Sequence, residues 1–277
     1  MTLQKNVFIT GCSSGIGYIT AFELKQRGYR VICSARKAED VSRLETEGFE
    51  CLQLDLADSA SIRRAVINLT ALTDGRIFAL FNNGAFGQPG AVEDLSRETL
   101  RNQFETNFFG THELTNLLIP LMRRQGSGRI IYNSSILGFV ALKFRGAYNA
   151  SKFALEGLAD TLRLELRGSG IYIVLIEPGP IESHFRRNAF AMYQRNIDPS
   201  SSFHKDTYRQ MEERLQKPGP AAPFTLPATA VAKKVILALE SRKPRSRYRV
   251  TFPTYLFACL KRLLPTLWLD KILHSVD

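Results

Sequence analysis

The sequence predicts an α/β protein with one Rossmann-like domain: a doubly wound parallel sheet with helices on both faces, followed by a C-terminal lid. Three observations support this. Short continuous apolar runs alternate with amphipathic stretches over the first two thirds of the chain, a glycine-rich turn joins the first run to the first stretch, and no linker interrupts the pattern. The 277 residues, 44% hydrophobic and 23% charged, are ordinary globular composition.

Each predicted strand is a short apolar run, and each predicted helix is an amphipathic stretch. The strands are expected at residues 6–10, 29–34, 51–54, 77–81, 129–133 and 171–176. The helices are expected at residues 16–26, 38–46, 59–72, 100–124, 148–167 and 228–241. Continuous apolar strands separated by helices form βαβ units, so the sheet should be parallel and covered on both faces.

The single domain, 1–277, divides into three parts. Residues 1–182 form the regular core. Residues 183–227 mix aromatic, charged and proline residues, so we expect an irregular lid after a strand's carboxyl end, where open α/β sheets bind ligands. Residues 228–277 should be a helical segment with a basic loop at 242–249. Its apolar stretch is too interrupted for the roughly 18 apolar residues of a spanning helix.

The net charge of +11 is concentrated near the C-terminus, where ten Lys or Arg follow position 232 against three acids. A solvated basic tail is the simplest interpretation, and attraction to an acidic partner or weak peripheral contact with anionic membrane is the alternative. No nucleic-acid-binding module accompanies the charge, so we expect no nucleic-acid partner.

The remaining composition excludes several classes of protein. Four scattered cysteines form no CxxC pair, and the four histidines have no ligand spacing, so neither a disulfide scaffold nor a metal site is expected. The N-terminus lacks the features of a secretory signal, which favours a cytoplasmic protein. Cys12 lies in the glycine-rich turn and is expected to be a packed thiol rather than a reactive thiolate.

The glycine-rich turn Thr10–Gly17 carries the first functional signal. Glycines let the backbone turn tightly and approach a pyrophosphate, whose charge then lies at the positive end of the following helix. The turn follows a predicted strand and precedes a predicted helix, which is the arrangement of a dinucleotide site. At the end of the second strand, Arg36 stands with Lys37 where NAD-preferring domains place an acid. A guanidinium there can pair with a 2′-phosphate.

Tyr148 and Lys152 are four residues apart on a predicted helix and therefore lie on one face. A phenol has a pKa near 10, and an adjacent ammonium is expected to lower it toward the range useful for proton transfer. Ser135, thirteen residues upstream, makes this otherwise common spacing specific.

With these motifs the sequence resembles the short-chain dehydrogenase/reductase family, from about Val7 to Ser183. The motifs are Thr10–Gly17, Asp55-Leu56, Asn82-Asn83-Gly84-Ala85, Asn107, Ser135, Tyr148 with Lys152, and Pro178-Gly179-Pro180-Ile181. The residues in these motifs are most similar to those of the branch that contains hydroxysteroid and retinol dehydrogenases. Bacterial NADP-dependent aldehyde reductases also share the segment from Lys261 to Pro265.

The resemblance implies a catalytic set of four residues. Tyr148 would exchange a proton with the substrate oxygen, Ser135 would hydrogen-bond that oxygen, Lys152 would hold the nicotinamide ribose, and Asn107 would position a water behind Lys152. The implied cofactor-binding residues are Gly11, Ser13, Ser14, Gly15, Ile16, Gly17, Arg36, Asp55, Leu56, Asn82, Tyr148, Lys152, Pro178, Gly179, Ile181 and Ser183. A homo-oligomer, dimer or tetramer, through the 100–124 and 148–167 helices is the family expectation.

Two departures from the family pattern stand out. Gly84 and Ala85 exchange the usual order of the small residues, so Ala85 would be strained if that position needs a positive φ. Ser183 replaces a threonine and keeps its hydroxyl. Neither change removes a reacting group.

The expected function is an NADP(H)-dependent oxidoreductase that acts on an alcohol/carbonyl pair and reduces lipophilic aldehydes or ketones. A steroid or retinoid dehydrogenase with the same site is the alternative enzyme, and an NADPH-binding redox sensor or scaffold is the non-enzymatic one. His184 follows the Pro-Gly segment, where it faces the substrate or is a structural or solvent-facing residue of the lid. Apolar residues there indicate a substrate pocket or packing within the lid. The pocket candidates are Phe139, Val140, Leu142, Phe185, Phe190 and Phe203.

Overall fold

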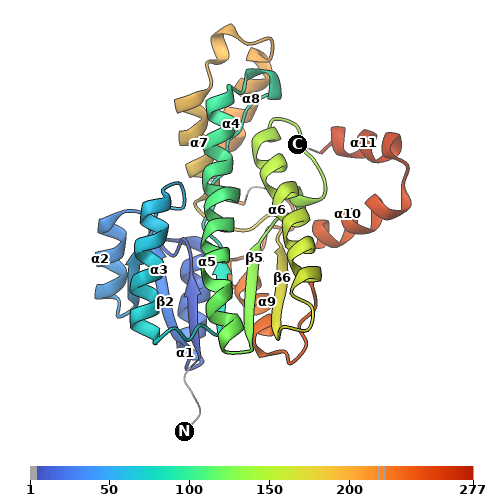
Figure 1. The fold of residues 1–277 in the computed structure, drawn as a ribbon. Coiled ribbons are helices and arrows are strands. Elements are labelled where there is room, and N and C mark those ends of the chain that lie inside the picture. The colour runs from blue at the N-terminus through green and yellow to red at the C-terminus, as the bar shows by residue number, and fades with distance from the viewer. Residues whose placement is uncertain (1–4, 218, 221, 277) are drawn as a thin grey trace.

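Seven parallel strands in the order β3-β2-β1-β4-β5-β6-β7 form the centre of the computed structural model, which describes residues 5–217, 219–220 and 222–276 (Figure 1). The ends of the predicted domain, residues 1–4 and 277, lie outside the described residues. The strands are β1 (Asn6–Ile9), β2 (Arg30–Ala35), β3 (Glu50–Gln53), β4 (Ala79–Asn82), β5 (Gly128–Asn133), β6 (Ile171–Glu177) and β7 (Arg247–Arg249). The predicted doubly wound parallel sheet is confirmed, and its strand order reverses between β1 and β4, where such sheets bind ligands.

Two helical layers cover the sheet, because successive strand residues point to opposite faces. Val7 and Ile9 face one layer, and Phe8 faces the other. The first layer contains α1 (Gly15–Gln26), α2 (Ala38–Thr46) and α9 (Thr229–Glu240). The second contains α3 (Ser59–Thr73), α5 (Thr111–Arg124) and α6 (Gly146–Glu165). Both apolar layers are therefore buried, as the apolar strands predicted.

The predicted helix at 100–124 is wrong as a single element. The chain forms α4 (Arg97–Phe104), a π-helical stretch η2 (Glu105–Gly110) and then α5. Gly110 permits the close approach of this stretch to the loop after β3, since a Cβ there would lie 1.7 Å from the Leu56 carbonyl oxygen. Wide π turns occur frequently at functional sites, and this one contains Asn107.

The expectation of an irregular segment at 183–227 is also wrong. It contains α7 (Phe185–Asn196) and α8 (Lys205–Gln216), whose inner positions bury Tyr193 and Tyr208 in one small apolar cluster. The Tyr208 hydroxyl accepts from the Ala91 N–H at 2.9 Å, which attaches the lid to the body. A parallel bridge between Ile181 and Leu226 closes the base of the excursion.

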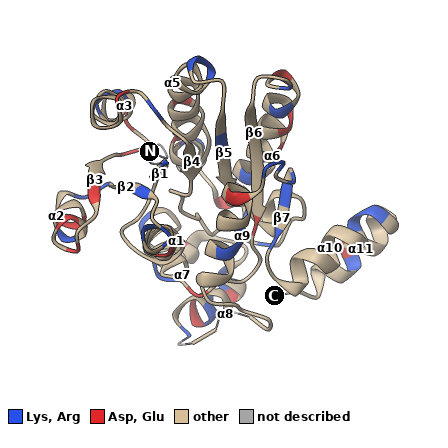
Figure 2. Ribbon diagram, turned by 90° about the horizontal axis from the view of Figure 1, so that it is seen from below, with Lys and Arg blue, Asp and Glu red and all other residues tan. Residues whose placement is uncertain are grey.

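The C-terminal part adds an edge strand and two helices. The predicted basic loop at 242–249 is wrong at its end, because Arg247–Arg249 forms β7 beside β6. The chain then forms α10 (Phe252–Leu263) and α11 (Thr266–His274), which extend away from the sheet as an arm (Figures 1 and 2). Among the described residues, no helix is both long enough and apolar enough to cross a bilayer.

Candidate active site

The glycine-rich turn after β1 forms a cradle for an anion. Gly11 and Gly15 have φ of 70° and 60°, and a Cβ on Gly17 would lie 2.3 Å from the Gly11 carbonyl oxygen. Helix α1 begins at this turn without a side-chain cap and without an acid in its first turn. Its first N–H groups and its positive end therefore suit a bound pyrophosphate, so the residues present fit a dinucleotide.

Asn83 braces this cradle from the end of β4. Its Nδ2 donates to the carbonyl oxygens of Thr10 and Gly11 at 3.0 and 3.1 Å, while the N–H groups of Asn83 and Gly84 donate to Thr10 Oγ1. The sequence analysis placed only its neighbour Asn82 in the site, and Asn82 instead donates to Thr115 Oγ1 at 3.0 Å. The only sequence feature that could have pointed to Asn83 is its place in the Asn82-Asn83-Gly84-Ala85 motif.

The exchange of Gly84 and Ala85 does not strain the chain. Ala85 does not have a positive φ, so the backbone strain that a positive φ would cause at an alanine is absent. The close approach of the two loops depends on Gly11, because a Cβ there would lie 2.8 Å from the Gly84 Cα. A Cβ on Gly84 would meet only side-chain atoms of Leu56 and Thr10, at 3.1 and 3.3 Å.

The adenosine side of the cradle is defined by the ends of β2 and β3. Arg36 is exposed directly after β2, and its carbonyl accepts from Gln53 Nε2 at 3.1 Å. The Asp55 carboxylate caps the following turn by accepting from the Ala57 N–H at 2.9 Å. Arg43, which the sequence analysis did not single out, donates to the Ser13 carbonyl at 2.6 Å and so ties α2 to the turn.

Residues 178–184, which follow β6, border the cradle on the side opposite the ends of β2 and β3. The Pro178 carbonyl accepts from the Ile136 N–H at 2.7 Å, which connects this segment to the residue after Ser135. Ser183 Cβ lies 3.2 Å from where a Cβ on Gly15 would be. A cavity of about 550 Å³ lies here, with Gly15, Ser183 and the exposed His184 among its lining residues. Gly15, which follows the first strand, and Ser183, which follows the sixth, thus line the same cavity.

Tyr148, Ser135 and Lys152 lie together at the carboxyl end of β5. The Lys152 Nζ lies 5.6 Å from the centre of the Tyr148 ring and donates to the Asn133 carbonyl oxygen at 2.7 Å. The Ser135 hydroxyl acts on the pKa of Tyr148, and its Oγ accepts from the Leu137 N–H at 3.1 Å.

The expected lowering of the Tyr148 pKa is wrong for this arrangement. Loss of hydration raises the pKa of Tyr148 to about 12, although the Ser135 hydroxyl acts in the opposite direction. The same loss of hydration lowers the pKa of Lys152 to about 8, against the effect of the Glu156 carboxylate. The Lys152 ammonium faces the ring and a backbone carbonyl, so desolvation dominates both groups.

Asn107 is held inside the π-helical stretch by three hydrogen bonds. Its Oδ1 accepts from the Phe86 N–H at 3.1 Å, and its Nδ2 donates to the Phe86 carbonyl and to Ser151 Oγ. Ser151 precedes Lys152 on α6, so Asn107 is fixed directly behind the catalytic helix.

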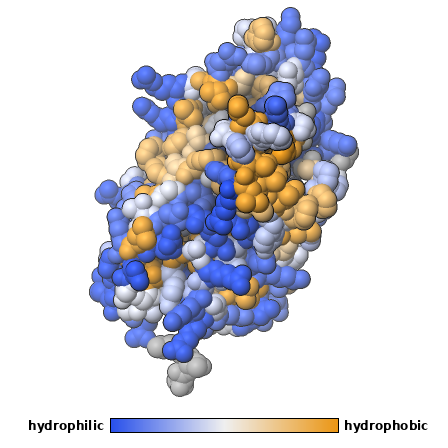
Figure 3. Space-filling model, turned by 90° about the vertical axis from the view of Figure 1, so that its right-hand side faces the viewer, coloured by the Kyte–Doolittle hydropathy of each residue, from blue (hydrophilic) through white to orange (hydrophobic). Residues whose placement is uncertain are grey.

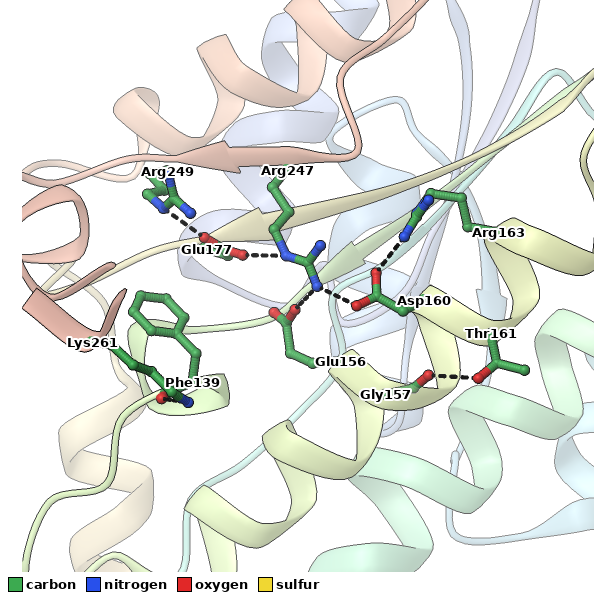
Figure 4. A network of polar contacts seen from close by, with 10 residues as sticks. All are labelled: Phe139, Glu156, Gly157, Asp160, Thr161, Arg163, Glu177, Arg247, Arg249 and Lys261. Carbon is green, nitrogen blue, oxygen red and sulfur yellow. Dashed lines mark hydrogen bonds and ion pairs between the residues drawn. The ribbon is translucent and has the colours of Figure 1, made fainter. Parts of the chain in front are cut away.

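A buried ionic cluster lies on the same face of α6, one turn beyond Lys152 (Figure 4). Arg247 on β7 lies 2.9 Å from Glu156, 2.7 Å from Asp160 and 2.9 Å from Glu177. Glu177 is only 1% exposed, and its burial raises its pKa to about 7. The sequence analysis missed this cluster because its members come from three separate elements.

The substrate side is apolar in part. The Phe185 ring lies 5.2 Å from the Tyr148 ring, edge to face, and so covers the tyrosine from the lid. A second cavity of about 770 Å³ lies between α6, the loop after Ser135 and the C-terminal arm, and Phe139, Val140 and Leu142 line it. Of the other candidates, Phe190 packs on Tyr193 in the lid, and Phe203 is 92% exposed, so it lines neither cavity.

The remaining candidates carry no chemistry of their own in the structure. Cys12 is buried and its Sγ–H donates to the Ile9 carbonyl, as a packed thiol does. Within the described part of the chain, no group of His, Cys, Asp or Glu is arranged to hold a metal ion.

Comparison with known proteins gives consistent matches. The sequence profile of the family described as short chain dehydrogenase matches residues 5–194. The chain is 44% identical over 273 residues to the uncharacterized oxidoreductase YbbO of Escherichia coli (strain K12), covering 99% of this chain and 95% of that protein. It is 32% identical over 277 residues to the NADPH-dependent 3-dehydrocapnine reductase of Ornithobacterium rhinotracheale, covering 96% and 95%. The crystal structure of a short-chain dehydrogenase from Streptomyces avermitilis superposes with a TM-score of 0.78 at 27% identity, covering 100% of both chains.

Proposed function

This chain belongs to the short-chain dehydrogenase family, and from that premise we propose that it is an NADP(H)-dependent reductase of lipophilic aldehydes or ketones. Family membership accounts for an oxidoreductase acting on an alcohol/carbonyl pair. The choice of cofactor and substrate class rests on the residues of this chain.

One observation carries the proposal: a tyrosine, a serine and a lysine gather beside an anion cradle, and an aromatic residue of the lid lies over the tyrosine. The Ser135 hydroxyl acts to lower the pKa of Tyr148 against the effect of burial, and Phe185 of the lid covers the Tyr148 ring. A carbonyl oxygen at the Tyr148 hydroxyl would meet a proton donor and a second hydrogen-bond donor, while its apolar substituents meet aromatic carbon.

The mechanism assigns one task to each group. Tyr148 donates its proton to the carbonyl oxygen, and Ser135 stabilises the negative charge that develops there. Lys152 supplies a positive charge near the phenol and would hold the ribose of a bound cofactor, and Asn107 holds Ser151, the residue before it. When bound, NADPH supplies the hydride.

The preference for NADP(H) is proposed from the end of β2. Arg36 is exposed there and can form charge-assisted hydrogen bonds with a 2′-phosphate, while the exposed Lys37 adds a second positive charge. One relative, the Ornithobacterium rhinotracheale reductase, is described as NADPH-dependent. A reducing compartment such as the cytoplasm suits the four free cysteines, of which Cys12 and Cys33 are buried.

Steroids and retinoids are the alternative substrate class, since they present the same alcohol/carbonyl pair on a larger apolar body. A panel of aliphatic aldehydes, aromatic ketones, ketosteroids and retinal, followed by NADPH oxidation, separates the two. Absence of turnover with every carbonyl, despite tight NADPH binding, would favour a redox sensor or scaffold instead.

The substitution Tyr148→Phe tests the mechanism. We expect kcat to fall by roughly 10²–10⁴-fold, because only the proton-donating oxygen is lost, while NADPH affinity changes little. Tyr255→Phe, on the exposed side of α10, is the matched control and should keep full activity. If Tyr148→Phe retains more than about a tenth of kcat, the assignment of the proton donor is wrong.

A further inference from the structure

We propose that the outer face of the C-terminal arm, α10 and α11, docks the protein onto anionic bilayers. This outer face is apolar although it is exposed: Leu263, Leu267 and Trp268 are 73%, 76% and 66% exposed. Phe252, Tyr255 and Leu256 continue it along α10, with exposures of 40% or more. Figure 3, which views the molecule from the side of the arm, shows apolar side chains gathered in its upper half with hydrophilic ones around them.

The opposite face of the arm already has a partner. Phe257 and Leu273 are buried against Val140 in a small cluster, and Lys261 donates to the Phe139 carbonyl. A helix that is apolar on both sides needs a second apolar environment. Within the described residues, the contact between the rings of Phe224 and Phe252 covers only the beginning of the outer face. The body of the protein therefore explains the inner face but not the outer one.

The charges of the arm favour an anionic surface. Arg262 and Lys271 are exposed beside the apolar residues, and Asp270 is the acid near them. Lys261 is also exposed, although its ammonium reaches the Phe139 carbonyl on the inner side. Aromatic and apolar side chains next to basic ones are the composition of helices that lie in the interface of anionic membranes. A Trp and a Tyr on this face suit the headgroup level of a bilayer.

A second copy of this chain is a poorer occupant. A two-fold interface places the same patch on both sides, so the basic residues of one arm would face those of the other. Like charges at close range are unfavourable unless counter-charges separate them, and the arm offers one acid against three bases. A bilayer containing anionic lipid provides both the apolar interior and the opposite charge.

The position of the arm gives the docking a consequence for the proposed reaction. Leu264 and Leu269 line the cavity of about 770 Å³ together with the loop that follows Ser135. Docking would bring this cavity close to the phase into which lipophilic carbonyl compounds partition. This last step rests on the proposed function, whereas membrane docking itself does not.

The experiment is vesicle co-sedimentation of the full-length protein. Vesicles of phosphatidylglycerol with phosphatidylcholine are compared with phosphatidylcholine alone, at low and at high salt. We expect binding to the anionic vesicles that weakens at high salt. The apolar triple variant Leu263→Ser/Leu267→Ser/Trp268→Ser and the charge variant Arg262→Gln/Lys271→Gln should each reduce the partition coefficient roughly ten-fold or more.

A matched control lies on α3, where Arg63, Arg64 and Ile67 form another exposed basic and apolar group. The variant Arg63→Gln/Arg64→Gln/Ile67→Ser should bind vesicles like the unmodified chain. Equal loss in this control, or undiminished binding in both arm variants, overturns the proposal. Absence of binding to anionic vesicles at low salt also overturns it.

Two further measurements separate the remaining outcomes. If the apolar variant fails to fold, judged by circular dichroism, the charge variant carries the test, since its two side chains are exposed. If arm variants shift the sedimentation coefficient without affecting vesicle binding, the arm is a subunit interface and the proposal is wrong. Tyr148→Phe protein should bind vesicles fully, so failure of the proposed reaction is distinguishable from failure of docking.

Discussion

Tyr148 combines a pKa raised to about 12 with a position beside an ammonium group. A phenol in this state keeps its proton throughout the physiological range, which suits donation to a carbonyl oxygen. Removal of a proton from an alcohol would need the phenolate, and forming it costs more when the pKa is high. Tyr148 is therefore present as the proton donor that reduction of a carbonyl requires.

Lys152 determines the expected pH dependence. Because burial lowers its pKa to about 8, its ammonium is lost as the pH rises above that value, and kcat/KM for reduction should fall there. The Glu156 carboxylate favours the ammonium, so Glu156→Gln should move this limb of the profile to lower pH. Initial rates from pH 6 to 10 measure both profiles. A limb that stays in place would show that Glu156 does not act on Lys152.

Arg36 provides a test of cofactor selection. Arg36→Ala should weaken NADPH binding by roughly 1.5–3 kcal/mol, the range for a hydrogen bond to a charged group, and leave NADH almost unchanged. Fluorescence titration with each cofactor measures the effect, and Arg64→Ala on α3, also exposed, is the control. Equal weakening of both cofactors would assign the selection to another residue.

At this scale the sequence indicated candidate site residues, but not the residues that hold them in place. Gly17, Ser135, Tyr148 and Lys152 are recognisable because residue type and spacing together define what they can do. Asn83 and Glu156 cannot be recognised in this way, because their roles depend on partners that are distant in sequence. Asn83 donates to the Thr10 and Gly11 carbonyls, and Glu156 pairs with Arg247. Contacts of that kind exist only once the strands are ordered in space.

At the scale of elements, Arg247 joins the edge strand β7 to β6 and to the catalytic helix α6. It is the shared partner of Glu156, Asp160 and Glu177, of which Glu177 is almost fully buried. Arg249 lies 3.2 Å from the other oxygen of Glu177 and supports the same strand pair. The three-residue strand β7 is therefore held by its side chains as well as by its backbone.

Removing this guanidinium should be costly. Arg247→Met leaves a buried carboxylate without its partner, and we expect the free energy of unfolding to fall by about 3–5 kcal/mol. Arg163→Met is the matched control, because Arg163 pairs only at the more exposed Asp160 and should cost about 1 kcal/mol or less. Urea denaturation at pH 8 compares them. Similar losses in both variants would mean that burial of the cluster contributes little.

The elements that the sequence analysis missed have common causes. Strand β7 is three residues long and mostly arginine, so it has no apolar signature. Helices α7 and α8 bury only Ala189, Tyr193 and Tyr208, too few for a strong period among many charges. The π-helical stretch depends on a backbone approach at Gly110 that no periodicity reports. By contrast, the six apolar strands were predicted within about two residues at each end.

At the scale of the whole molecule, we expect a homo-oligomer through α5 and α6. Both helices lie side by side against the sheet and carry exposed apolar residues: Leu117 on α5 is 37% exposed, and Phe153 and Leu164 on α6 are 40% and 66% exposed. Covering them would remove apolar surface from water. Sedimentation velocity should show a dimer or tetramer that Leu117→Glu/Leu164→Glu dissociates. Ile67→Glu on α3 is the control, and a monomeric native chain would contradict the prediction.

The whole architecture was the most predictable level, because alternation of apolar runs and amphipathic helices leaves few topologies for a parallel sheet. The position of the lid was predicted for the same reason, as it follows a carboxyl strand end. Its internal structure was not, since that depends on packing against residues 88–95, which precede it by a hundred positions.

The bridge between Ile181 and Leu226 has a consequence for how such a chain can change over evolutionary time. The excursion leaves the sheet and returns at one paired point, with the Glu182 N–H donating to the Leu226 carbonyl at 3.0 Å. Because the bridge fixes both ends of this segment, insertions and deletions within it need not displace the strands or the glycine-rich turn. The length and sequence of the lid can therefore diverge among descendants of this chain, while the sheet and the glycine-rich turn keep their positions.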